Sequence, residues 1–215
     1  MTYRIAFGRL PVIAVIMASP LAILVAGAFF DRWGYALSEM TPEAVRWLAA
    51  LMSLIGNTTL PTIVAAAFWI GLSVQIARTP APNDGQLRHT RWQMAYLFCS
   101  VAGAGLITTV IKHAVGRARP GVAGGFDNLA FHPFAEVDAW WSFPSGHTTG
   151  AVATALVLGA VFPRWRWHFI AFAGLAGLSR ILLGMHWVSD VFAGATVAYF
   201  WTRYVTFIFN RTALG

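Results

Sequence analysis

Charged side chains are scarce in this chain. Only 11% of its 215 residues are Asp, Glu, Lys or Arg, whereas 58% are hydrophobic, and the mean hydropathy is +0.63. A soluble domain of this length carries about a quarter charged residues. The composition therefore excludes an ordinary soluble domain and predicts an integral membrane protein.

Cysteine is almost absent as well. Cys99 is the only one and lies inside an apolar run, so an intrachain disulfide framework and a cysteine-based metal site are excluded. We interpret Cys99 as a small buried hydrophobe. The net charge of +7 is scattered over the ends of apolar segments. Because it forms no continuous basic patch, we expect no nucleic-acid partner.

Long apolar runs dominate what is present, and they predict six membrane spans in one domain, residues 1–215. The runs cover residues 10–30, 58–77, 92–111, 148–162, 167–183 and 187–208. The first run also resembles a signal peptide, with Ala26-Gly27-Ala28 as the cleavage site. Its 21 uncharged residues are long for that purpose, which favours a retained span.

The segment 31–56 predicts a short helix on the membrane surface. Thr41-Pro42-Glu43 is typical of a helix start, and apolar residues then recur at helical spacing. About 14 residues are too few to cross a bilayer, so we expect an amphipathic interfacial helix. The predicted fold class is an all-α, six-transmembrane-helix bundle with this one interfacial helix.

The distribution of Arg and Lys predicts the orientation. Six spans put both termini on one side, and outside the polar motifs described next that side carries nine basic residues against three. The positive-inside rule then makes the termini cytoplasmic. Short uncharged stretches in the last three runs require the motif residues to be counted into the helix ends. We therefore expect a polar site near the outer membrane surface, partly sunk among the helices.

Three short polar patterns stand at the outer ends of these runs, where charge is costly. They are Lys112 followed after six residues by Arg119-Pro120, then Pro144-Ser145-Gly146-His147, and finally Ser179-Arg180 with His186 and Asp190. His113 and Arg117 lie near the first pattern, either supporting the site from outside or lying at the membrane interface, and we commit to neither role. Clustering of three cations, two histidines and a carboxylate on one side indicates a functional site.

Phosphoryl transfer is the chemistry that suits these residue types, since it needs mostly charge stabilisation. Lys112, Arg119 and Arg180 can neutralise phosphate oxygens without a metal. Ser145 and the backbone N–H groups around Gly146 begin a span, and a helix N-terminus binds anions.

The two histidines can do the covalent work. His186 and Asp190 are four residues apart, which on a helix stacks them on one face. Asp190 can then fix the tautomer of His186 and leave its other nitrogen free to attack phosphorus. His147 can protonate the leaving oxygen and later deprotonate water.

In order, spacing and identity, the three patterns resemble the signature motifs of the type 2 phosphatidic acid phosphatase (PAP2) family. The likeness covers residues 112–190 in detail. It implies a six-helix, metal-independent lipid phosphatase without a cofactor, similar at its active site to acid phosphatases and vanadium haloperoxidases. It also implies roles for matching positions: His186 as nucleophile with Asp190, His147 as acid and base, and phosphate-binding residues Lys112, Arg119, Arg180 and Ser145.

The resemblance also limits the substrate, which we expect to be a membrane lipid phosphate, with no obligate protein partner. Compactness, short loops and the lack of a retrieval signal favour a bacterial inner membrane, with the site facing the periplasm or exterior. Phosphatidic acid, phosphatidylglycerophosphate, undecaprenyl diphosphate and lipid A phosphates all suit the family. The motifs do not choose among them, because specificity depends on the shape of the groove.

Several alternatives use the same residues. A lipid phosphotransferase would pass the phosphate to a second lipid, and a haloperoxidase would hold vanadate. A transporter would use the charges as a pathway, although transporters favour repeated halves and midplane charges. The histidines and Asp190 could ligate a metal, which three nearby cations disfavour. In the structural alternative, the cations snorkel from span ends and the histidines are packed polar groups.

Overall fold

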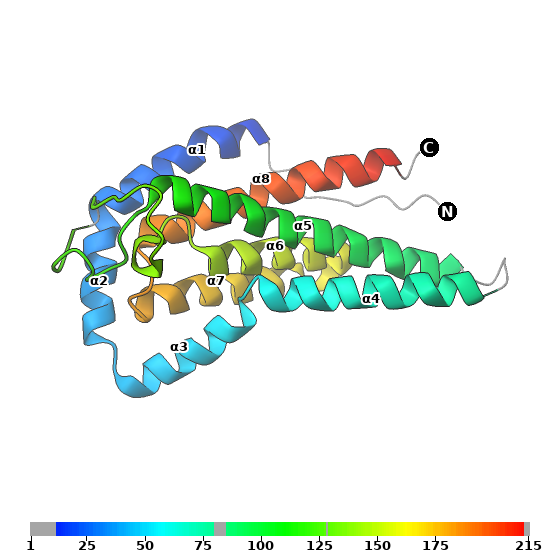
Figure 1. Cartoon of the computed structure of the whole chain (residues 1–215), viewed down its shortest axis with the longest axis horizontal. Helices are drawn as coiled ribbons and strands as arrows, with labels where there is room; N and C mark the ends of the chain where they lie inside the picture. The colour runs from blue at the N-terminus through cyan, green and yellow to red at the C-terminus, as the bar shows by residue number, and fades with distance from the viewer. Residues whose placement is uncertain (1–11, 80–84, 128, 213–215) are drawn as a thin grey trace.

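The computed structural model describes residues 12–79, 85–127 and 129–212, and within these ranges it consists of helices and loops without a β-strand (Figure 1). The fold is therefore all-α, as predicted. The α-helices are α1 (Val12–Val25), α2 (Asp31–Met40), α3 (Glu43–Ile55), α4 (Thr59–Arg78), α5 (Gly85–Val115), α6 (Gly146–Val161), α7 (Arg166–Leu182) and α8 (Val188–Thr212).

Six of these helices, α1 and α4 to α8, coincide with the six predicted apolar runs. The start of the first run, residues 10–11, lies outside the described residues. Among the described residues, two segments are long and apolar enough to cross a membrane, Glu43–Arg78 and Gly85–Val115, and Gly146–Val161 is a shorter apolar helix. The number of six membrane crossings stays a prediction.

The segment 31–56 holds two helices where the sequence predicted one. A π-helical turn, Ala26–Phe30, continues α1 into the unpredicted α2. The predicted start at Thr41-Pro42-Glu43 is confirmed, because Pro42 directly precedes α3. α3 packs against α7 and buries Ala49 and Ser53, while Trp47, Leu48, Leu51 and Leu54 are exposed. Small residues of α3 thus face α7 while large apolar residues face outward, and the placement of this helix on the membrane surface stays a prediction.

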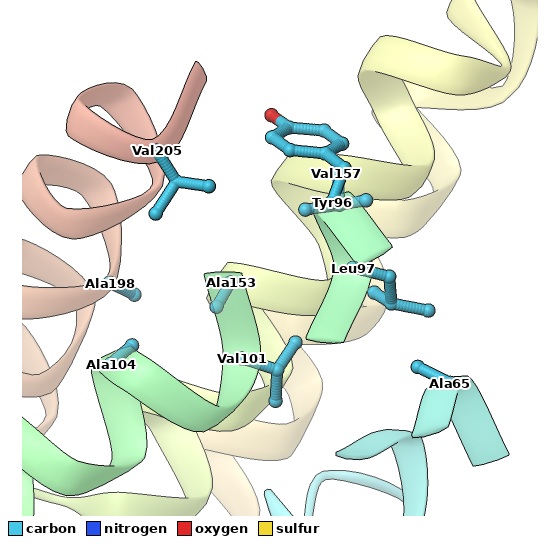
Figure 2. Close-up of a cluster of buried hydrophobic side chains, with 9 residues drawn as sticks. All are labelled: Ala65, Tyr96, Leu97, Val101, Ala104, Ala153, Val157, Ala198 and Val205. Atoms are coloured by element: carbon cyan, nitrogen blue, oxygen red, sulfur yellow. The ribbon is translucent and has the colours of Figure 1, made fainter. Parts of the chain in front are cut away.

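Small apolar side chains form the centre of the bundle (Figure 2). The largest buried cluster joins α4, α5, α6 and α8 and consists of Ala65, Tyr96, Leu97, Val101, Ala104, Ala153, Val157, Ala198 and Val205. The Tyr96 hydroxyl is hydrogen-bonded to Thr206 Oγ1 at 2.7 Å, which satisfies two polar groups inside this apolar region. Alanine-rich faces let the helices approach closely.

The connections that carry the polar motifs all gather at one end of the bundle. Figure 1 shows α2, the long connection between α5 and α6 and the turn between α7 and α8 at this end. Gly116 begins the long connection with φ +58°, and a Cβ there would lie 1.9 Å from the His132 carbonyl oxygen. Only glycine fits this turn, which folds the connection back over the end of α5.

Close contact between α6 and α8 depends on Gly194. A Cβ at this position would lie 2.5 Å from the carbonyl oxygen of Ser145 and 3.1 Å from Thr149 Oγ1. The Thr149 hydroxyl already donates to the Gly194 carbonyl at 3.2 Å. The beginning of α6 is therefore held directly against α8.

We expect Gly194→Ala to lower the unfolding free energy by about 1–3 kcal/mol, because the added methyl group overpacks this contact. Thermal unfolding of the detergent-solubilised protein measures the change. Gly174→Ala on α7 is the matched control, since a Cβ there has no atom within 4 Å and alanine favours a helix by up to about 1 kcal/mol. Equal effects of the two substitutions would contradict the close-contact interpretation.

Candidate active site

The third motif is built around the turn between α7 and α8. Arg180 lies in the last turn of α7, and its carbonyl oxygen accepts the N–H groups of Met185 at 3.0 Å and His186 at 3.3 Å. Gly184 has φ +64°, which closes the turn. α8 begins only at Val188. His186 therefore precedes the helix, and the expectation that it stacks with Asp190 on one helical face is wrong.

Asp190 explains where α8 begins. Its Oδ2 accepts the backbone N–H of Trp187 at 2.9 Å, three residues earlier, as the acid of a capping box does. Because this bond caps the helix at Trp187, α8 begins after His186, and the histidine lies in the preceding turn. His186 Nδ1 nevertheless lies 3.5 Å from Asp190 Oδ2, so the predicted pair is close together.

The Asp190 carboxylate is fully buried and is held by several donors. Ser142 Oγ donates to Oδ2 at 2.5 Å, and Arg117 Nη1 donates to Oδ1 at 2.6 Å. By comparison, the 3.5 Å separation from His186 is too long for a good hydrogen bond.

The first motif supplies two cations that are anchored on the long connection. Lys112, in the last turn of α5, donates from Nζ to the Trp141 carbonyl oxygen at 2.5 Å. Arg119 donates from Nη2 to Asp138 Oδ1 at 2.7 Å. The Asp138 side chain is 72% exposed, and an exposed ion pair of this kind is weak. The Arg119 side chain can therefore leave this ion pair at little cost in free energy.

The second motif forms the start of α6. Ser145 is the N-cap, and its Oγ accepts the Thr148 N–H at 3.4 Å and the Thr148 hydroxyl at 2.9 Å. Its own N–H donates to the Asp190 carbonyl oxygen at 3.0 Å. Ser145 is fully buried, and a Cβ on the neighbouring Gly146 would lie 3.7 Å from Lys112 Cε. The positive end of α6 thus lies beside a cation.

The three cations surround the two histidines. His147 interacts electrostatically with Arg180, Lys112 and Arg119, and His186 does so with Lys112 and Arg180. Arg180 donates from Nη1 to the Ser53 hydroxyl, and its buried Nε has no hydrogen-bond partner among the described residues. Lys112 and Arg180 are hydrogen-bonded to carbonyl and hydroxyl groups and form no ion pair among the described residues.

Residues outside the motifs complete the site. Arg117 is buried and paired with Asp190 at 2.6 Å and with Asp31 at 2.8 Å, whereas the sequence left its role open between support of the site and the membrane interface. Ser142 and Ser53 were also missed. The one available signal was a lone acid, Asp31, at the end of the first apolar run, and nothing in the sequence paired it with Arg117.

Burial lowers the pKa of His186 from its ordinary range to about 3. The positive charges of Lys112 and Arg180 act in the same direction, whereas Asp190 opposes them. A charged imidazole is disfavoured in a dry site that already contains cations. His186 is therefore neutral at ordinary pH, which is the nucleophilic form of histidine.

Such a combination of cations, histidines and a helix N-terminus defines a class of enzymes that act on phosphate esters, and comparison with known proteins identifies the family. Residues 93–213, more than half of the chain, match the model of the PAP2 superfamily. The chain therefore belongs to the PAP2 superfamily, and it is a phosphatase of the bacterial lipid phosphatase type.

Named relatives agree with this assignment. A lipid A 1-phosphatase of Rhizobium etli is 33% identical over 80% of this chain and 75% of its own length. A decaprenylphosphoryl-5-phosphoribose phosphatase of Mycobacterium tuberculosis is 35% identical over 82% of this chain and 83% of its own. The crystal structure of a transmembrane PAP2-type phosphatidylglycerolphosphate phosphatase from Bacillus subtilis superimposes on this chain with a TM-score of 0.55, and the aligned part covers 89% of this chain and 94% of that one. At 18% identity, this last likeness shows the fold alone.

The buried neutral His186 predicts a specific loss of stability in acid. The unfolded chain takes up a proton near pH 6.5, whereas the folded state resists it down to about pH 3, so acid favours unfolding. Between pH 7 and pH 5 we expect the wild type to lose about 2 kcal/mol more unfolding free energy than His186→Gln. Unfolding in detergent at both pH values measures this difference, and equal losses would show that His186 is not held neutral.

Proposed function

We propose that the chain hydrolyses a phosphate monoester or diphosphate of a membrane lipid through a phosphohistidine at His186. The observation that carries this proposal is the closeness of a buried, neutral His186 to Asp190, beside Lys112 and Arg180, which form no ion pair with a carboxylate among the described residues. A phosphate group would supply the missing negative charge. Lys112, Arg119, Arg180, Ser145 and Gly146 are the residues we expect to bind it.

The first half-reaction forms the covalent intermediate. Nδ1 of His186 faces Asp190, so Nε2 is the nitrogen that attacks phosphorus. A nitrogen–phosphorus bond forms while the phosphorus–oxygen bond to the lipid breaks, and His147 gives a proton to the departing oxygen. The cations and the N-terminus of α6 stabilise the charge on the equatorial oxygens.

The second half-reaction releases phosphate. Water attacks the phosphorus while His147 takes one of its protons, the nitrogen–phosphorus bond breaks, and His186 returns to its neutral form. Three side-chain cations do the work that a divalent metal does in other phosphatases. Among the described residues no three His, Cys, Asp or Glu side chains are grouped for metal binding. The reaction as proposed uses neither a metal nor another cofactor.

For location, we propose six membrane spans in a bacterial inner membrane, with cytoplasmic termini and a site that faces the periplasm. The excess of basic residues on the side of the termini supports this orientation. For substrate, we place lipid A phosphate first because two lipid A 1-phosphatases are 33% identical to this chain. Phosphatidic acid, phosphatidylglycerophosphate and undecaprenyl diphosphate complete the set to be tested.

The direct test is phosphate release by the detergent-purified protein from these four lipids in a chelating buffer. We expect the wild type to release phosphate from at least one lipid and His186→Ala to release none, because the nucleophile is gone. A near-wild-type rate for His186→Ala would contradict the nucleophile assignment. Activity that vanishes with the chelator and returns with a divalent ion would contradict the metal-free mechanism. Phosphate found on a second lipid would identify a phosphotransferase.

Arg180→Ala tests whether Arg180, whose buried Nε has no hydrogen-bond partner among the described residues, stabilises the transition state. We expect its turnover to fall about 10²- to 10³-fold, as for the loss of one donor to the transition state. Arg46→Ala is the matched control, because this exposed arginine of α3 donates to the Ser38 carbonyl oxygen at 3.0 Å, away from the three motifs, and should leave turnover unchanged. Equal rates for the two variants would make Arg180 a purely structural cation.

A further inference from the structure

Asp31 is a buried carboxylate that the proposed reaction does not use. It is the first residue of α2 and is completely shielded from solvent. Its Oδ2 accepts Arg117 Nη2 at 2.8 Å and the Ser189 hydroxyl at 2.8 Å, and its Oδ1 accepts the Ser189 N–H at 2.8 Å. α2 is thereby attached to the first turn of α8.

Arg117 connects this carboxylate to the site. One arm of its guanidinium, Nη2, binds Asp31, while the other, Nη1, binds both Ser189 Oγ at 2.7 Å and Asp190 Oδ1 at 2.6 Å. The four side chains are all buried, with at most 5% exposure. They form one continuous charged network from α2 through the long connection to α8.

Such a network is costly to bury, and an apolar replacement of similar volume is often at least as stable. Attachment of α2 alone therefore does not explain it. Its charge has a consequence at the site, because two carboxylates share the Arg117 guanidinium. Arg117 therefore divides its attraction between Asp31 and Asp190, and Asp31 adds a second negative charge to the network.

That charge matters because the attack on phosphorus leaves the His186 ring positive. The other groups that face His186 are Lys112 from α5 and Arg180 from α7, and His147 begins α6 beside the same cations. The positive charges of Lys112 and Arg180 disfavour a positively charged His186 ring. Asp190, with Asp31 behind it, favours the positive ring.

We infer that Asp31 and Arg117 are positioning residues that hold the Asp190 carboxylate oriented and negatively charged against His186. This inference rests on the function proposed above. Asp31 supplies the second negative charge, and Arg117 carries its effect to Asp190. Ser189 fixes the geometry by bridging both partners. The network thus acts on the nucleophile through Asp190 and does not touch the phosphate.

The test is Asp31→Asn in the full-length, detergent-purified protein, which removes the charge and keeps the shape. We expect kcat to fall about 10- to 100-fold, as for outer-shell partners of active-site ligands, while KM changes less than twofold because the phosphate-binding cations are untouched. The pH profile of kcat/KM should move to lower pH by roughly half to one unit, since loss of a negative charge disfavours nearby protonated groups.

Glu39→Gln is the matched control, because it removes an exposed carboxylate from the same helix and should change neither kcat nor the profile. Ser189→Ala removes the bridging hydroxyl without a change in charge, so we expect a loss of about threefold to tenfold and no shift of the profile. Unchanged kcat and pH profile in folded Asp31→Asn would overturn the inference and make the network purely structural.

If Asp31→Asn does not fold, Arg117→Lys provides the test, because a point charge cannot bridge two carboxylates. A fall in kcat of less than twofold in that variant would also overturn the inference. Wild type and His186→Ala are measured in parallel. If the wild type releases no phosphate, or His186→Ala keeps its rate, the proposed function fails; if both behave as expected, the Asp31 and Arg117 variants test the network alone.

Discussion

The buried carboxylate of Asp190 is the group around which the active-site end of the bundle is organised. A charge in an apolar interior is stable only when donors surround it, and here they come from Arg117, Ser142 and the backbone of Trp187. These contacts bring the long connection onto the start of α8. They also decide where α8 begins, and hence that His186 lies in a turn facing the carboxylate.

The four cations near the site differ in their partners, and this difference separates their roles. Arg117 is enclosed by two buried carboxylates, so its charge is committed to the protein. Lys112 and Arg180 are bound to carbonyl and hydroxyl groups, while Arg119 is paired with an exposed carboxylate. The latter three keep charge available for an anion, whereas Arg117 does not.

The ends of three helices also place positive charge where an anion could bind. α5 and α7 finish at the site with Lys112 and Arg180 in their last turns, where a cation complements the negative end of a helix. α6 starts there with Ser145 as its cap, and presents the positive end that attracts anions. The polarity of the helices therefore favours the local arrangement of charges before any ligand is present.

Much of this organisation could be predicted from the sequence, because it depends on local patterns. Apolar runs located the six long helices, and the spacing of the motifs brought together residues that do meet at one end. α2 was not predicted, since a π-helical turn carries α1 directly into it without a break in the sequence pattern. The helical stacking of His186 with Asp190 was wrong, because a capping bond decides the boundary of α8 and spacing alone does not reveal it.

By itself, then, the sequence determined the helical class, the membrane character and the motif residues, because periodicity, composition and spacing are properties of neighbouring residues. Only the tertiary structure decided that Asp31 meets Arg117 and Ser189, and that Ser53 of α3 meets Arg180. The hydrogen bonds around Arg117 and Asp31 join residues that are 72 to 158 positions apart along the chain. Pairing over such separations depends on how the helices pack and on the need to compensate buried charge, which no local pattern encodes.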